Sequence, residues 1–146
     1  MKRVGFLLAA FFIFSLFPIS TASAQVPVRM RVIQASNVGH NIDPSLKDVH
    51  HELGSLFSFT SYRLLREENV SLSQNHPVTI TAHPGRFLEV NLVGLQRDAA
   101  KLRIRVIREG KDILDTQVRL SPGRTVLIGG PRHGEGVVIY AVSARF

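Results

Sequence analysis

The chain contains no cysteine. Its absence excludes a disulfide framework, thiol chemistry and a thiolate metal site. It also excludes the lipid-bearing cysteine that follows the signal segment of the usual bacterial lipoproteins. Tryptophan is absent too, and there are only two tyrosines. The aromatic girdles that flank membrane-spanning strands are therefore hard to build from this sequence.

No hydrophobic run is long enough to cross a membrane as a helix. An apolar, uncharged run at residues 4–17 follows a positively charged start at residues 1–3 and is broken by Pro18. At 1.5 Å per residue it covers about 21 Å, short of a hydrocarbon core of about 30 Å. Ala22-Ser23-Ala24 then fits the small-x-small rule for cleavage. The sequence predicts a cleavable secretory signal over residues 1–24, followed by one domain over residues 25–146.

The charge balance beyond residue 24 is mildly positive, with 16 basic residues against 11 acidic ones and a net charge of about +5. This favours anionic partners such as acidic proteins, cell-wall polymers or lipid headgroups. Nucleic acid is not an expected partner, because the basic residues are not clustered with aromatic ones. The arginines are instead expected on solvated sheet faces: Arg29, Arg31, Arg63, Arg66, Arg103, Arg105, Arg108, Arg119 and Arg124.

The apolar pattern predicts one short helix and many short strands. Residues 26–35 alternate as a strand with one apolar face. Asp43-Pro44 is typical of a helix start, and an apolar stripe follows it. Further strands are predicted at 59–66, 70–73, 77–82, 87–95, 102–108, 113–120, 125–128 and 137–146. The predicted fold is α+β and mostly antiparallel, a small β-sandwich of about eight strands with one short amphipathic helix near the start of the mature chain.

No catalytic or metal site is predicted. Asp48, His51 and Ser55 are the right residue types for a nucleophilic triad, but on one helix they would share its solvent face without an oxyanion hole. His50 and His51 point about 100° apart on a helix and so do not chelate one ion together. We expect a protein that is not an enzyme and that needs no cofactor.

The most distinctive segment is the glycine-rich stretch at residues 129–136. It is predicted to be a loop between the last two strands, in which bare backbone and two side chains hold an anion. It lacks the Lys-Ser/Thr and the following helix of a phosphate loop. The predicted binding residues are Gly129, Gly130, Arg132 and His133.

Residues 116–130, Thr-Gln-Val-Arg-Leu-Ser-Pro-Gly-Arg-Thr-Val-Leu-Ile-Gly-Gly, resemble the strand–turn–strand near the end of the secretin domain of outer-membrane secretion channels. That family's segment runs Thr-x-Val, a turn glycine, then Thr-Val-Val-Ile-Gly-Gly. Here Pro131, Arg132 and His133 follow, where secretins continue with apolar residues. The resemblance implies a cell-envelope setting, and no functional residue is carried over from it.

Three functions stay open. The first is an exported, non-enzymatic binding or scaffolding protein of the bacterial envelope, periplasmic or extracellular. Its partner would be another envelope protein or an anionic envelope component, with any membrane association not through a spanning helix. The second is a small outer-membrane β-barrel, because Tyr140, Val142 and Ala144 alternate before a terminal Phe146 that resembles an insertion signal. The third is an envelope enzyme with a site assembled from loop residues.

Overall fold

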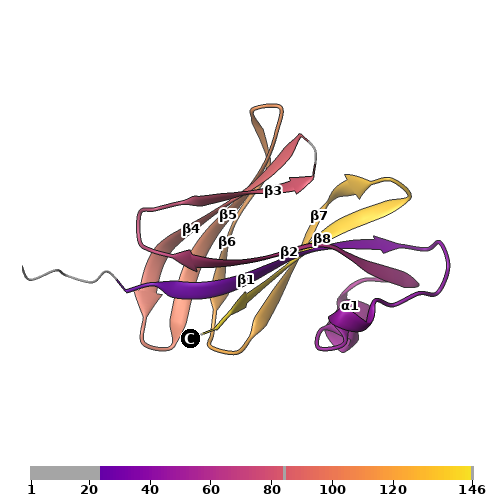
Figure 1. Cartoon of the computed structure of the whole chain (residues 1–146), viewed down its shortest axis with the longest axis horizontal. Coiled ribbons are helices and arrows are strands. Elements are labelled where there is room, and N and C mark those ends of the chain that lie inside the picture. The colour runs from indigo at the N-terminus through magenta and orange to yellow at the C-terminus, as the bar shows by residue number, and fades with distance from the viewer. Residues whose placement is uncertain (1–23, 84, 146) are drawn as a thin grey trace, which may run out of the picture.

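The computed structural model describes residues 24–83 and 85–145. The predicted signal, residues 1–24, falls outside them except for Ala24 and stays a prediction. The described chain forms eight strands and two short helical segments (Figure 1). In chain order they are β1 Val26–Ser36, η1 Pro44–Leu46, α1 His50–Leu56, β2 Ser61–Leu72, β3 Val78–His83, β4 Arg86–Gln96, β5 Ala99–Arg108, β6 Lys111–Leu120, β7 Thr125–His133 and β8 Gly136–Ala144.

The strands form two four-stranded sheets, in the orders β2-β1-β8-β7 and β3-β4-β5-β6. Every pairing within them is antiparallel. The chain passes from one sheet to the other between β2 and β3 and again between β6 and β7, so residues 116–130 join strands of different sheets. The predicted antiparallel β-sandwich with one short helix is confirmed.

The main core lies between the two sheets and takes alternate residues of each strand, because successive side chains in a strand point to opposite faces. Removing such side chains from water stabilises the fold by roughly 1.5–3 kcal/mol each. The β2-β1-β8-β7 sheet contributes Val26, Val28, Met30, Val32, Leu72, Val138, Tyr140, Val142 and Ala144. The β3-β4-β5-β6 sheet, called the β3–β6 sheet below, contributes Ile80, Ala82, Leu88, Val90, Leu92, Ala100, Leu102, Ile104, Val106 and Leu120.

A second core lies on the outer face of the β2-β1-β8-β7 sheet, under residues 37–60. It consists of Ile33, Ala35, Leu46, Val49, Leu53, Tyr62, Ile139 and Ala141. The central strands β1 and β8 are therefore apolar on both faces over part of their length. The prediction of a single apolar face for residues 26–35 is wrong, because Ile33 and Ala35 pack against the helical segment.

The predicted helix starts where expected but is broken in two. The Asp43 carboxylate accepts a hydrogen bond from the Ser45 backbone N–H at 3.0 Å, which caps η1, and α1 begins only at His50. Leu53 is buried, whereas Leu56 is 65% exposed. At the other end of α1 the Tyr62 hydroxyl lies 3.2 Å from the Leu53 carbonyl and 3.1 Å from the Phe57 carbonyl and donates to them.

Two predicted breaks between strands are wrong. The polar residues 67–69 were expected to form a turn, but they lie inside β2 and pair with β1, and Glu67 forms an ion pair with Arg29. The glycine-rich stretch was expected to be a loop, but β7 runs through it to His133. In both places pairing with a neighbouring strand outweighs the local turn signal.

Candidate binding surfaces

The predicted binding residues Gly129, Gly130, Arg132 and His133 all lie in β7 rather than in a loop. Gly129 pairs with Ile139, and Arg132 with Val137. Two residues of β7 therefore oppose Val138 alone between these pairs, as in a β-bulge. The chain then turns through Gly134, which has φ +58°, a backbone conformation that favours glycine.

The glycines of this hairpin are needed for close packing. A Cβ on Gly130 would lie 2.6 Å from Cε2 of Tyr140, and a Cβ on Gly136 would lie 1.8 Å from the Ala35 carbonyl oxygen. Both distances are shorter than van der Waals contact. Packing of β8 against β1 and of β7 against Tyr140 therefore accounts for these residues without a ligand.

The same hairpin forms side-chain hydrogen bonds with both sheets. Arg86 of β4 donates from Nη2 to the Arg132 carbonyl at 3.1 Å. Gln34 of β1 donates from Nε2 to the His133 carbonyl at 3.5 Å, the long limit for a hydrogen bond. These contacts hold the backbone of β7 in place, and the Arg132 side chain remains exposed.

The structure separates the polar trio of the helical segment. Asp48 lies before α1 and receives two hydrogen bonds from Arg31, from Nη1 at 2.8 Å and Nη2 at 2.9 Å. The Ser55 hydroxyl donates to the Glu52 carbonyl at 3.1 Å. The expectation that Asp48, His51 and Ser55 share one helix face is therefore wrong for Asp48, which lies outside α1 and is hydrogen-bonded to Arg31 of β1.

In the Arg31–Asp48 ion pair, the arginine is buried and the aspartate is partly exposed to solvent. The Arg31 side chain is 0% exposed, whereas that of Asp48 is 52% exposed. Arg31 is thus an exception to the arginines expected on solvated faces. Its hydrogen bonds hold the pKa of the Asp48 carboxyl below the ordinary value, against an opposing effect of burial.

Residues 24–83 and 85–145 contain no group of three His, Asp or Glu side chains placed to hold a metal ion. None of the helical segments within these residues has the length and apolarity needed to cross a membrane.

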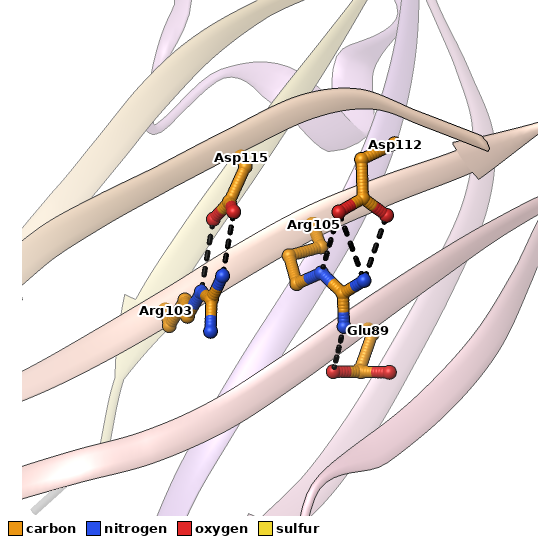
Figure 2. Close-up of polar contacts among 5 residues, drawn as sticks. All are labelled: Glu89, Arg103, Arg105, Asp112 and Asp115. Atoms are coloured by element: carbon orange, nitrogen blue, oxygen red, sulfur yellow. Dashed lines mark hydrogen bonds and ion pairs between the residues drawn. The ribbon is translucent and has the colours of Figure 1, made fainter.

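The outer face of the β3–β6 sheet carries a network of ion pairs, shown in Figure 2. Arg103 donates to both oxygens of Asp115, at 3.0 and 2.6 Å. Arg105 donates to both oxygens of Asp112 and, from Nη1 at 3.1 Å, to Glu89. These residues come from three adjacent strands, with Glu89, Arg105 and Asp115 opposite one another across the sheet.

The network pairs two arginines with three carboxylates, so this end of the face carries no excess of positive charge. Hydrogen bonds from Arg103 lower the pKa of the Asp115 carboxyl, and the hydrogen bonds that Arg105 donates to Asp112 and Glu89 raise the pKa of Arg105. The lowered pKa of Asp115 and the raised pKa values of Arg103 and Arg105 keep these three side chains ionised at neutral pH. They confirm the solvated sheet face expected for Arg103 and Arg105.

The other end of the same face is net positive. Gly94, Lys101 and Arg119 lie in one row across β4, β5 and β6. Lys101 forms no ion pair with a described residue, and Arg119 only approaches Asp98 at 3.9 Å. A depression of about 340 Å³ opens here, lined by Gly94, Gln96, Ala99, Lys101, Gln117, Val118 and Arg119.

A larger depression of about 590 Å³ lies on the other sheet, beside residues 36–44. Its lining includes Asp43, Arg63 and Glu135. Arg63 also donates to Gln34 at 2.8 Å. Because it carries two acids and one base, this depression has no preference for an anion.

The outer face of the β3–β6 sheet was found only in the structure. Sequence alternation put Arg103 and Arg105 on one face of a strand, but it gave no partner strands and so no carboxylates beside them. The available signal for the depression was Gly94, an isolated glycine inside a predicted strand, which often marks a bulge or an open position. Comparison of the chain with protein-family models, curated proteins and solved structures finds no match.

Proposed function

We propose that the chain is an exported, non-enzymatic binding or scaffolding protein of the bacterial cell envelope, and that it binds through the outer face of its β3–β6 sheet. Residues 1–24 support export by their charged start, apolar run and small-residue exit. The resemblance of residues 116–130 to secretins supports an envelope setting.

The observation that carries the proposal is the difference between the two outer faces. Residues 37–60 pack on the β2-β1-β8-β7 sheet and bury a second core there. No described segment packs on the outer face of the other sheet, where Phe87 and Val93 of β4 are more than a third exposed. Exposed apolar side chains with a polar surround are typical of interaction surfaces.

The charge of this face favours an anionic partner. The β4–β5 and β6–β7 connections lie at the same end of the molecule (Figure 1). They and the adjoining strand ends hold Arg97, Lys101, Arg119 and Arg124 but only one acid, Asp98. A net positive end attracts acidic proteins, phosphorylated polymers or anionic headgroups.

Affinity capture from envelope extracts tests this function. The chain is expressed in a bacterium with its own N-terminus, recovered, and weighed by intact mass spectrometry. Loss of residues 1–24 is the expected result. The recovered protein is then used as bait at low and high salt. We expect partners that dissociate as salt screens exposed charges beyond about 8–10 Å.

A pair of charge-reversed baits locates the binding face. Lys101→Glu with Arg119→Glu reverses the positive end of the face, and Lys47→Glu with Lys111→Glu makes the same charge change before α1 and at the opposite end of β6. Capture lost only with the first pair supports the proposal. An uncleaved N-terminus, no captured partner, or equal loss with both pairs would contradict it. A protein insoluble without detergent micelles would favour the outer-membrane alternative instead.

A further inference from the structure

We infer that the depression at Gly94 is a binding site for a phosphate group. The inference rests on the proposed function, since it gives a ligand chemistry to the face proposed to bind an envelope component. Three features of the depression support it: basic and amide-bearing residues line it, no carboxylate does, and it opens beside a glycine.

The depression is lined by hydrogen-bond donors. Lys101 and Arg119 are neighbours across β5 and β6, and Gln96 and Gln117, whose side chains carry amide donors, line the same depression. Arginine presents two parallel N–H groups to a phosphate, and lysine supplies a compact charge. Two positive charges match a phosphate monoester or diester, which carries one or two negative charges.

The lining contains no carboxylate. The one acid near it is Asp98, whose contact with Arg119 is 3.9 Å between side chains that are 79% and 65% exposed. An exposed pair of this kind is worth little and gives way to a better partner. By contrast, Arg103 and Arg105 on the same face are saturated by Asp115, Asp112 and Glu89, so they have little capacity left for a ligand.

The hollow exists because residue 94 has no side chain. A Cβ there would lie 3.6 Å from the Lys101 Cβ, which is an ordinary contact, and the φ angle of Gly94 lies outside the left-handed region that favours glycine. Gly94 thus differs from Gly136, where a Cβ would collide with backbone. Position 94 therefore accepts a Cβ without a clash, and a longer side chain there would occupy part of the depression.

Titration of the exported chain with sodium phosphate, followed by amide nuclear magnetic resonance, tests the site. We expect saturable shifts at Gly94, Gln96, Lys101 and Arg119, with dissociation in the millimolar range because the donors are exposed. Sodium chloride and sodium acetate at the same ionic strength serve as ion controls. Shifts spread over the whole surface, or equal shifts with acetate, would overturn the assignment.

Variants separate the charges from the hollow. Lys101→Gln with Arg119→Gln is expected to weaken phosphate binding by about fivefold or more, while the control Lys47→Gln with Lys111→Gln leaves it within about twofold. Gly94→Leu keeps every charge and is expected to abolish the shifts. Binding unaffected by both site variants, each with a folded amide spectrum, refutes the site.

A last arm identifies the source of the phosphate. Vesicles of phosphatidylglycerol in phosphatidylcholine are compared with phosphatidylcholine vesicles alone, using sedimentation of wild type and of Lys101→Gln with Arg119→Gln. Binding to the anionic vesicles that the variant loses assigns a lipid headgroup, and phosphate shifts without vesicle binding assign a soluble phosphate ester. Phosphate binding without capture of any envelope partner would uphold the site and reject the proposed function. Capture of an envelope partner without phosphate binding would uphold the proposed function and reject the site.

Discussion

On the β2-β1-β8-β7 sheet, residues 37–60 convert part of the outer face into a second core, whereas the β3–β6 sheet keeps its outer face open within the described chain. The first sheet is therefore constrained from both sides, and the second from one. We call the first the covered sheet and the second the open sheet. Similar residues therefore have different surroundings in the two: buried and packed on the outer face of the covered sheet, and in contact with solvent on that of the open one.

Arginine–aspartate pairs show this difference directly. The Arg31 side chain on the covered sheet is 0% exposed, and its Nε has no hydrogen-bond partner among the described residues. The Arg103 and Asp115 side chains on the open sheet are 44% and 38% exposed. A buried charge is costly to leave unpaired, whereas an exposed pair contributes about 0–1 kcal/mol.

The largest expected effect comes from a glycine in the covered sheet. Gly136→Ala places a methyl group 1.8 Å from the Ala35 carbonyl oxygen, so β8 has to move away from β1. We expect a loss of about 3 kcal/mol or more in the free energy of unfolding, measured by urea denaturation. Gly94→Ala in the open sheet is the control, expected to be neutral or to stabilise by about 0.5 kcal/mol. Equal costs for the two variants would abolish the contrast.

The second effect is the loss of the partner of Arg31. Asp48→Asn leaves the buried guanidinium without a counter-charge, and we expect a cost of about 2 kcal/mol. This is below the value for a fully buried pair because Asp48 is half exposed to solvent. The comparison is made by denaturant unfolding of this variant and of Asp98→Asn, which changes an exposed acid in the turn between β4 and β5. A cost under about 0.5 kcal/mol for both would show that the covered pair is not constrained.

The same pair gives a pH dependence whose sign follows from its pKa. The pKa of Asp48 is lower in the folded state than the ordinary 3.8 of the unfolded state. Its stabilising contribution is therefore complete above the unfolded value and is lost as pH falls through the folded one. Unfolding measured between about pH 6 and pH 2 should show a shallower acid loss for Asp48→Asn than for wild type. Parallel curves would contradict this assignment.

A smaller effect is expected at the end of α1. Tyr62→Phe removes a hydroxyl that donates to the Leu53 and Phe57 carbonyls. We expect a cost of about 1 kcal/mol, the net value of one buried hydrogen bond. Ser55→Ala, which removes an exposed hydroxyl bond to Glu52, is the matched control and should cost less than about 0.5 kcal/mol. If the two substitutions cost the same, Tyr62 does not fix the helix end.

The smallest effect should come from the ion-pair network of the open sheet. A double-mutant cycle with Arg103→Ala and Asp115→Ala is expected to give a coupling below about 1 kcal/mol that falls further in high salt. Thermal unfolding at two salt concentrations measures it. A coupling that exceeds the cost of Asp48→Asn would mean that the open face, rather than the covered one, holds the fold together.

The sequence predicted what short-range patterns determine. Alternation located strands at 102–108 and 113–120, and the Asp43 cap located the start of the helical segment. Pairing partners are not encoded locally, so Glu67 was predicted in a turn although it pairs with β1. The positions that depart from simple alternation, Ile33 and Ala35, were the available sign that a second layer covers β1.

For the candidate site on the outer face of the β3–β6 sheet, the sequence predicted the residue types but not which strands bring them together. Basic residues on a sheet face were expected, but the carboxylates that neutralise Arg103 and Arg105 come from other strands. The lack of such a partner for Lys101 depends on the sheet order as well. The glycine-rich stretch was predicted to bind an anion because its glycines leave the backbone bare. In the structure, Gly130 is required by close packing against Tyr140, whereas packing does not require a glycine at position 94.

Arg31 also bears on how the strands of the covered sheet find their alignment. Because β1 is apolar on both faces around Ile33, sliding it by one residue along its neighbours would still bury hydrophobic side chains. Such a slip exchanges the two faces of a strand. It would carry the Arg31 guanidinium into the space between the sheets, away from Asp48. One charged side chain thus penalises the misaligned pairing that the surrounding aliphatic residues would tolerate.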